Sequence, residues 1–207
     1  MNNPIIILGN GGHASVLTEM LLLQGRKILG FTAPEEQRNF YGLAYLGTDE
    51  IVGTINPERV DLVLGLGTVN ISTVRHSFFE ELKNQGYRFA TCVHPTAIIS
   101  STASLAEGVQ VMAGAIVQPR VQIRENTIIN TGSIIEHDCL IGAHVHVAPG
   151  VTLSGSVHIG DYSHIGTGSS VIQGIEIGDK SLIGAGAVVI SNIGTNKKAF
   201  GVPAKEV

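Results

Sequence analysis

Three consecutive residues, Glu136-His137-Asp138, have the side chains best suited to acid–base chemistry in this chain. An imidazole titrates near neutral pH, so it can accept a proton from an attacking nucleophile. A neighbouring carboxylate can orient the ring and increase its basicity. Either Glu136 or Asp138 could do so, since adjacency in sequence does not show which carboxylate reaches the imidazole. The run therefore indicates a base with a carboxylate partner, and a solvated surface histidine is the alternative.

A second candidate site is the glycine-rich run at residues 9–14, Gly-Asn-Gly-Gly-His-Ala, between the apolar residues 5–8 and a helical pattern over 15–24. A strand, a Gly-x-Gly-x-x-Ala loop and a helix form the context of a nucleotide-binding loop. Small residues there let the backbone approach a phosphate, and helix N–H groups attract its charge. A dinucleotide site would also need an acidic residue after the next strand, predicted at 27–31, to hold the ribose. Thr32 and Ala33 occupy that place, so a dinucleotide is not expected.

The rest of the first 93 residues completes a small α/β domain. A strand over 62–67 runs into a glycine turn, a helix is predicted from about 71 to 84, and a strand over 88–93 ends at His94-Pro95. Open α/β sheets bind ligands at the carboxyl ends of their strands, where we expect a nucleotide-sugar pocket. The candidate contacts are Gly9, Asn10, Gly11, Gly12, His13, Thr32, Gly67 and Thr68. The alternative is that the glycines only form tight turns and that His13 is structural rather than a neighbour of the sugar or phosphate.

An aliphatic residue occupies every sixth position from Ile99 to Val189, sixteen times without a gap, and a small or β-branched residue stands two positions earlier. A period of six fits neither a helix nor a continuous strand, and it is a known β-helix repeat. Each triplet predicts a short strand with its first and third residues inward, and the other three residues turn a corner. His137 falls at a corner, outside the core register. Glycine is expected where a corner needs a positive φ, and the corner glycines are Gly142, Gly160, Gly166, Gly178 and Gly184.

These features together resemble one family along the whole chain, the sialic-acid O-acetyltransferase and nucleotide-amino-sugar N-acetyltransferase family. It includes bacterial UDP-bacillosamine-pathway and GDP-perosamine N-acetyltransferases. The motifs are Gly-Asn-Gly-Gly-His at 9–13, Asn-Thr-Gly-Ser-Ile-Ile-Glu-His-Asp at 130–138 and Gly-Val-Pro-Ala-Lys at 201–205. The resemblance implies an α/β, Rossmann-like N-terminal domain over 1–93. A left-handed parallel β-helix with coils of eighteen residues would follow over 94–195, and then a tail over 196–207 near coenzyme A.

The resemblance also implies the chemistry. His137 would be the general base and Asp138 its partner, and the nucleophile would attack the thioester of acetyl-CoA directly, without an acyl-enzyme. Gly155, one coil away from His137, would contact the acetyl group, and its N–H could serve the oxyanion. Further acetyl-CoA contacts implied in this way are His146 from the opposite subunit's wall, Thr167, Ala185 and Lys205. The active sites would lie between the subunits of a homotrimer.

The implied substrate is a nucleotide-linked amino sugar, acetylated on a 4-amino group for bacterial surface glycan or glycoprotein synthesis. O-acetylation of a sialic acid or a related sugar is the rival, because the same base serves an amine and a hydroxyl. The sequence does not specify the sugar, the nucleotide or the pathway. A non-catalytic scaffold protein would be expected to have lost the base, and the intact run Glu136-His137-Asp138 argues against it.

The composition argues against nucleic acids and membranes as partners of this protein. The formal net charge is −4, tryptophan is absent and aromatic residues make up 5% of the chain, so no nucleic acid is expected. No apolar stretch approaches 18 residues and the N-terminus does not resemble a signal peptide, so we expect no membrane segment and a cytoplasmic protein. Cys92 and Cys139 are expected to be buried, reduced thiols.

Several histidines raise the possibility of a zinc site. His144, His146 and His164 could imitate the three-histidine site of the γ-class carbonic anhydrases, which use the same β-helix, whereas His158 belongs to another face. That family lacks the N-terminal glycine loop and the Glu-His-Asp corner. We therefore expect no metal and no zinc hydratase activity.

Overall fold

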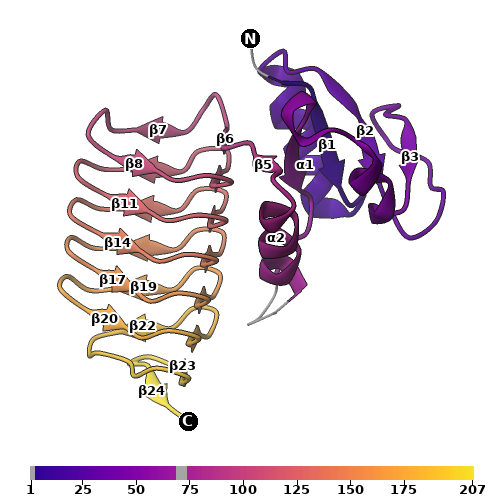
Figure 1. Cartoon of the computed structure of the whole chain (residues 1–207). Helices are drawn as coiled ribbons and strands as arrows, with labels where there is room; N and C mark the ends of the chain where they lie inside the picture. The colour runs from indigo at the N-terminus through magenta and orange to yellow at the C-terminus, as the bar shows by residue number, and fades with distance from the viewer. Residues whose placement is uncertain (1–2, 69–73) are drawn as a thin grey trace. The chain divides into compact units, whose positions relative to one another are not determined.

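The computed structural model describes residues 3–68 and 74–207. These residues form two compact units, an N-terminal one of residues 3–68 and 74–95 and a C-terminal one of residues 96–207 (Figure 1). Within the described part of the chain, no helix has the length and apolar character needed to cross a membrane.

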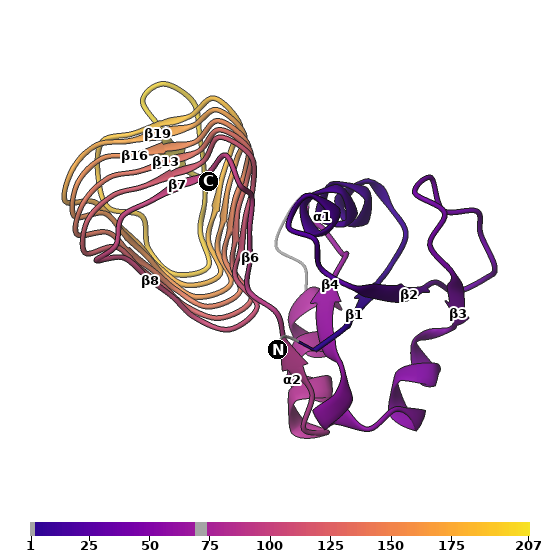
Figure 2. The same ribbon diagram turned by 90° about the horizontal axis from the view of Figure 1, so that it is seen from above.

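The N-terminal unit is built on a parallel sheet in the order β3-β2-β1-β4-β5. Its strands are β1 (Ile5–Leu8), β2 (Ile28–Thr32), β3 (Tyr45–Gly47), β4 (Asp61–Leu64) and β5 (Arg88–Phe89). Strand β1 is buried along its whole length, which explains its unbroken aliphatic run, since helices cover both faces of such a sheet. Ile6 and Leu8 pack with Phe79 and Leu82 of α2 (Val74–Asn84), and α1 (Gly12–Leu23) covers the opposite face (Figure 2).

The predicted elements of this unit occur in the structure with changed boundaries. Helix α1 begins at Gly12 rather than at Ser15, because Gly11 already accepts the first helical hydrogen bond from the Ser15 N–H. The strand predicted over 62–67 ends at Leu64, and the one over 88–93 divides into β5 and β6 (Cys92–Val93). The predicted start of the second helix lies outside the described residues. Strand β3 and two 3-10 helices, η1 (Asp49–Thr54) and η2 (Pro57–Arg59), were not predicted.

The C-terminal unit is a left-handed parallel β-helix with three faces, whose triangular section is visible in Figure 2. The first face holds β7 (Ile98–Ile99), β10 (Ile116–Val117), β13 (Ile134–Ile135), β16 (Thr152–Leu153), β19 (Ser170–Val171) and β22 (Val188–Val189). The second holds β8 (Ser104–Leu105), β11 (Gln122–Ile123), β14 (Leu140–Ile141), β17 (His158–Ile159) and β20 (Glu176–Ile177). The third holds β9 (Gln110–Val111), β12 (Ile128–Ile129), β15 (His146–Val147), β18 (His164–Ile165), β21 (Leu182–Ile183), β23 (Lys198–Phe200) and β24 (Lys205–Glu206).

Residues eighteen apart pair directly between successive coils, as in the series Val117, Ile135 and Leu153, which confirms the expected coil length. The repeated aliphatic residues fill the interior. Buried hydroxyl groups also join the coils: the Ser163 Oγ donates to the Gly178 carbonyl at 2.8 Å and accepts from the Ser181 N–H at 3.0 Å. Each coil is thereby held to the next by side chains as well as by the backbone ladder.

The corner glycines serve a different purpose from the one predicted. Gly142, Gly160 and their three equivalents lack the positive φ expected of them. They are needed for close approach, because a Cβ on Gly160 would lie 2.4 Å from the backbone nitrogen of Asp179 in the next coil. The left-handed corner positions belong to other residues. One such position is occupied in successive coils by Arg120, Asp138, Ser156 and Gly174, with φ of 63°, 63°, 59° and 69°.

Candidate active site

His137 lies at the corner between β13 and β14, where the backbone turns from the first face of the β-helix to the second. Its Nδ1 is 2.7 Å from Oδ2 of Asp138, and its side chain is 55% exposed. The left-handed backbone of Asp138 accompanies this close contact between neighbouring side chains. Among residues 3–68 and 74–207, the Glu136 carboxylate has no hydrogen-bond or ion-pair partner. Asp138 is therefore the carboxylate that holds the imidazole.

Arg120 completes this group of side chains and was not predicted. Its Nε is 2.6 Å from Oδ1 of Asp138 and its Nη2 is 2.7 Å from Oδ2, so the guanidinium binds both carboxylate oxygens. Hydrogen bonds from Arg120 and then from His137 hold the pKa of Asp138 well below its usual range. The spacing of eighteen residues between two opposite charges was the signal in the sequence that could have identified Arg120.

Gly155 lies against the imidazole, as its position one coil from His137 predicts. A Cβ built on Gly155 would be 2.6 Å from Cε1 and 2.8 Å from Nε2 of His137, so the ring occupies the space of a side chain. In the described structure the Gly155 N–H has no backbone acceptor. Glycine is thus the residue that allows the imidazole of His137 to pack against the next coil.

The other residues expected to bind acetyl-CoA occupy different edges of the β-helix. His146 is on the third face, where its Nε2 lies 3.0 Å from Nδ2 of Asn130. Thr167 and Ala185 are in successive coils at the corner between the third face and the first, whereas His137 is at the corner between the first face and the second. Lys205 lies on β24, beyond the last coil. One chain therefore does not bring these residues to His137.

The predicted substrate contacts gather at the carboxyl ends of β1, β2 and β4. Gly9, with φ of 107°, and Asn10 connect β1 to α1, and Gly12 and His13 form the first turn of that helix rather than the loop. The Asn10 Oδ1 accepts a hydrogen bond from the Asn39 Nδ2 at 2.7 Å. A Cβ on Gly67 would meet the His13 Cβ at 3.3 Å, so the second glycine turn lies beside the first.

Thr32, at the end of β2, contacts another side chain of the N-terminal unit. It is fully buried, and its hydroxyl group donates to Oδ1 of Asp49 at the start of η1. An acidic side chain, seventeen residues later in the sequence, thus lies beside the end of β2. No local pattern identified Asp49, because its approach to Thr32 depends on how η1 follows β3. Thr68 ends the described segment that follows β4.

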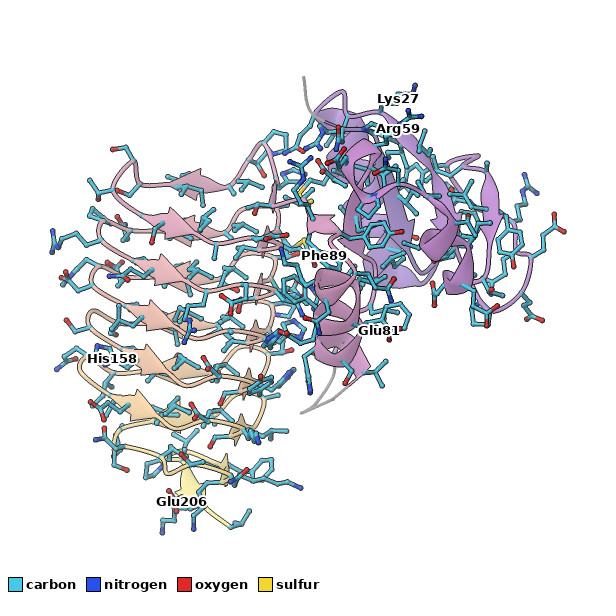
Figure 3. All side chains as sticks on the ribbon, viewed as in Figure 1. Lys27, Arg59, Glu81, Phe89, His158 and Glu206 are labelled. Atoms are coloured by element: carbon cyan, nitrogen blue, oxygen red, sulfur yellow. The ribbon has the colours of Figure 1, made fainter. Side chains whose placement is uncertain are left out.

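Of the histidines considered for zinc, His146 and His164 are in contact, with ring centroids 4.9 Å apart, but His144 lies on another part of the coil. His144 stacks on Tyr162 with ring centroids 4.9 Å apart, and its Nδ1 lies 3.0 Å from Nδ2 of Asn126. It lies at a corner, whereas His146 and His164 lie on the third face. His158 points outward on the second face (Figure 3). Within the described ranges, no three residues of His, Cys, Asp and Glu are grouped to hold a metal ion.

Known proteins resemble both units. The family model of the PglD N-terminal domain matches residues 4–82, and the bacterial transferase hexapeptide (six repeats) model matches residues 120–155 and 156–191. A curated relative, the UDP-N-acetylbacillosamine N-acetyltransferase of Bacillus subtilis (strain 168), is 38% identical over 111 residues. That alignment covers 53% of this chain and 51% of the relative, so the matched region is about half the relative's length.

Two solved structures match along the whole chain. The acetyltransferase domain of PglB from Neisseria gonorrhoeae FA1090 is 32% identical, covers 100% of both chains and has a TM-score of 0.94. PerB from Caulobacter crescentus, solved with CoA and GDP-perosamine, is 31% identical over 99% of this chain and 97% of its own, with a TM-score of 0.91. The resemblance noted in the sequence is thus confirmed. The chain belongs to the family of acetyltransferases that contains PerB and the acetyltransferase domain of PglB, in which a PglD-type N-terminal domain precedes a hexapeptide-repeat β-helix.

Proposed function

We propose that this protein is an acetyl-CoA-dependent N-acetyltransferase that acts on the amino group of a nucleotide-linked amino sugar. The observation that carries the proposal is the imidazole of His137, held by Asp138 at Nδ1 and lying on Gly155. The substrates of the relatives support it, since PerB was solved with CoA and GDP-perosamine and the PglB domain with acetyl coenzyme A.

The Asp138 contact supports a separate role for each ring nitrogen. A carboxylate accepts hydrogen bonds, so Nδ1 carries the proton and Nε2 is left with a lone pair. Nε2 takes a proton from the sugar amine as that nitrogen attacks the thioester carbonyl. The carbonyl oxygen becomes an oxyanion, for which the N–H of Gly155 is the candidate donor. Collapse of the tetrahedral intermediate breaks the C–S bond, and the CoA thiolate recovers the proton from the imidazolium.

The proposed assembly is a homotrimer with active sites between subunits. His137 lies at one corner of the β-helix and Thr167 and Ala185 lie at another, so a second copy is needed to bring the two sets together. The first face also has an outward column of aliphatic residues, in which Ile98 is 64% exposed and Ile116 is half-buried. Such a patch is typical of an interface between copies, and a head-to-tail contact forms a ring when its rotation closes, as a homotrimer requires. His146 and Lys205 are proposed to contact acetyl-CoA in the same groove.

The proposed sugar site is the carboxyl edge of the N-terminal sheet. Gly11 and Gly12 leave the backbone there open to a phosphate, and His13 and Gly67 lie beside them. Gly9 has a positive φ and packs against the second glycine turn, where a Cβ would meet Leu66 at 3.3 Å. Asn10 and Thr68 complete the proposed contacts, with Thr32 acting through Asp49. We place the protein in the cytoplasm, where acetyl-CoA is supplied, and both cysteines are free thiols as that compartment requires.

The test measures thiol release from acetyl-CoA with UDP-, GDP- and CMP-linked sugars that carry amino or hydroxyl groups. Turnover is expected with one 4-amino nucleotide sugar, and His137→Ala should lower kcat by roughly 100- to 10,000-fold. His158→Ala is the matched control, because that histidine is 46% exposed on the second face. Turnover with only a sialic acid would establish O-acetylation instead. A protein that neither turns over any sugar nor binds acetyl-CoA would be a scaffold.

A further inference from the structure

Arg120 and Asp138 form a bidentate pair that the chemistry described so far does not use. They occupy the same left-handed corner position in successive coils, and the Asp138 N–H donates to the Pro119 carbonyl at 3.1 Å, which fixes their spacing. The guanidinium Nε binds Oδ1 at 2.6 Å and Nη2 binds Oδ2 at 2.7 Å. Oδ2 also accepts from the His137 Nδ1 at 2.7 Å. One carboxylate oxygen is thus shared between the base and the guanidinium.

This pair differs from an ordinary ion pair on a protein surface. The Arg120 side chain is 64% exposed and that of Asp138 is 36% exposed, and pairs at such positions contribute little to stability. Two parallel hydrogen bonds, however, fix the plane of the carboxylate as a single contact would not. A carboxylate that cannot rotate keeps Oδ2 directed at Nδ1. The contact therefore acts mainly on the orientation of His137, and its contribution to the free energy of unfolding is small.

We propose that Arg120 is a positioning residue for the base. It holds Asp138 against His137 through two hydrogen bonds and offsets the negative charge of that carboxylate beside the imidazole. The inference rests on the proposed function and extends it to a residue outside the Glu-His-Asp run.

The charges around His137 give the direction of the effect. On its own corner are the carboxylates Glu136 and Asp138, and on the preceding coil is Arg120. Among the described residues of the following coil, Gly155 lies against the ring, and it carries no charge. Burial raises the pKa of the neighbouring Cys139 thiol to about 11, so this group is also uncharged. Without Arg120, two carboxylates would remain with no cation, and the imidazolium form would be favoured.

The test compares Arg120→Gln, Arg120→Lys and a control, Arg124→Gln. Arg124 is 61% exposed and pairs with Asp161 at 3.6 Å, away from His137 and Asp138. For Arg120→Gln we expect kcat to fall roughly 10- to 100-fold, because the ring loses its fixed position. The acid limb of the pH profile of kcat/KM should move to higher pH, with the KM for acetyl-CoA nearly unchanged. Arg120→Lys should keep the limb in place, since it retains the charge, but recover kcat only in part.

A second measurement keeps the inference testable if no sugar is turned over. In protein labelled with ¹³C at histidine Cε1, the His137 resonance is assigned from its loss in His137→Asn and then titrated. Arg120→Gln should move its midpoint to higher pH, and Arg124→Gln should not. An unchanged midpoint in Arg120→Gln, or an acid limb that moves equally in the control, would overturn the role of Arg120. Absence of turnover with a shifted midpoint would instead count against the proposed reaction.

Discussion

Replacement of Gly155 by alanine should displace the base while leaving the coil intact. An alanine Cβ would lie 2.6 Å from Cε1 of His137, and ordinary van der Waals contact begins at 3.4 Å, so the ring must withdraw by about 0.8 Å. A misplacement of about 1 Å can cost about 100-fold in rate. We therefore expect kcat/KM to fall roughly 100-fold, which corresponds to about 2.7 kcal/mol in the activation barrier.

The backbone gives no reason for an additional loss of stability. Gly155 lacks a left-handed φ, so alanine adds no strain there, and its carbonyl still accepts from the Gly174 N–H at 3.0 Å. Alanine also keeps the N–H proposed for the oxyanion. The variant therefore changes the position of the imidazole without removing the proposed oxyanion donor. A fall in rate with an unchanged thermal midpoint would thus report on the position of the ring.

The assay is steady-state thiol release by wild type and Gly155→Ala, together with thermal unfolding of both. Gly53→Ala is the control, because a Cβ at Gly53 has no heavy atom within 4 Å and its φ is ordinary. The expected result is a loss of activity in Gly155→Ala alone, with both variants unfolding near the wild-type temperature. Full activity of Gly155→Ala would refute the stacked position of the base. A large drop in its melting temperature would show that the contact is structural.

Three further expectations can be checked without a sugar substrate. Because Arg120 lowers the pKa of Asp138, the carboxylate stabilises the fold above the pKa of an unfolded Asp and this contribution is lost as the pH falls below about 4. Melting temperatures of wild type should therefore fall more steeply with acid than those of Asp138→Asn, and parallel curves would contradict this. Ser163→Ala should lower the free energy of unfolding in urea by about 1–3 kcal/mol, because the Gly178 carbonyl and the Ser181 N–H of the next coil lose their partner. A value near zero would show that these two hydrogen bonds do not stabilise the fold. Burial raises the pKa of Cys92 to about 12 and that of Cys139 to about 11, so neither thiol should react with a disulfide reagent at pH 8 before unfolding, and prompt labelling would show that one is accessible.

The β-helix could be predicted because its repeat is local. Inward residues recur every six positions whatever the rest of the chain does, so the sequence alone indicates which side chains form the core and that His137 stands outside it. The conformation of the corners could not be predicted in the same way. A glycine such as Gly160 is required by the neighbouring coil rather than by its own φ, and only the stacking of coils brings Asp179 to it.

The N-terminal unit shows the same division between local and distant effects. The aliphatic run of β1 and the glycine loop predicted a strand followed by a helix, and both are present. The sequence has no acidic residue directly after β2, and the absence of a dinucleotide site stays a prediction. Asp49 reaches Thr32 because of the path that the chain takes through β3 and η1. These segments are short and irregular, so no periodic pattern in the sequence predicts that path.

The site around His137 could likewise be predicted only in part from the sequence. The run Glu136-His137-Asp138 predicted a base from residue types alone, and the repeat placed Gly155 one coil away from His137. Which carboxylate contacts the imidazole, and that Arg120 contacts the same carboxylate, were decided only by the folded chain. The left-handed backbone at Asp138 accompanies its contact with Nδ1, and the stacking of equivalent corners brings the guanidinium onto the same carboxylate. Side chains eighteen residues apart meet because each coil supplies the hydrogen-bonding edge for the next, a contact that exists only once the coils have closed.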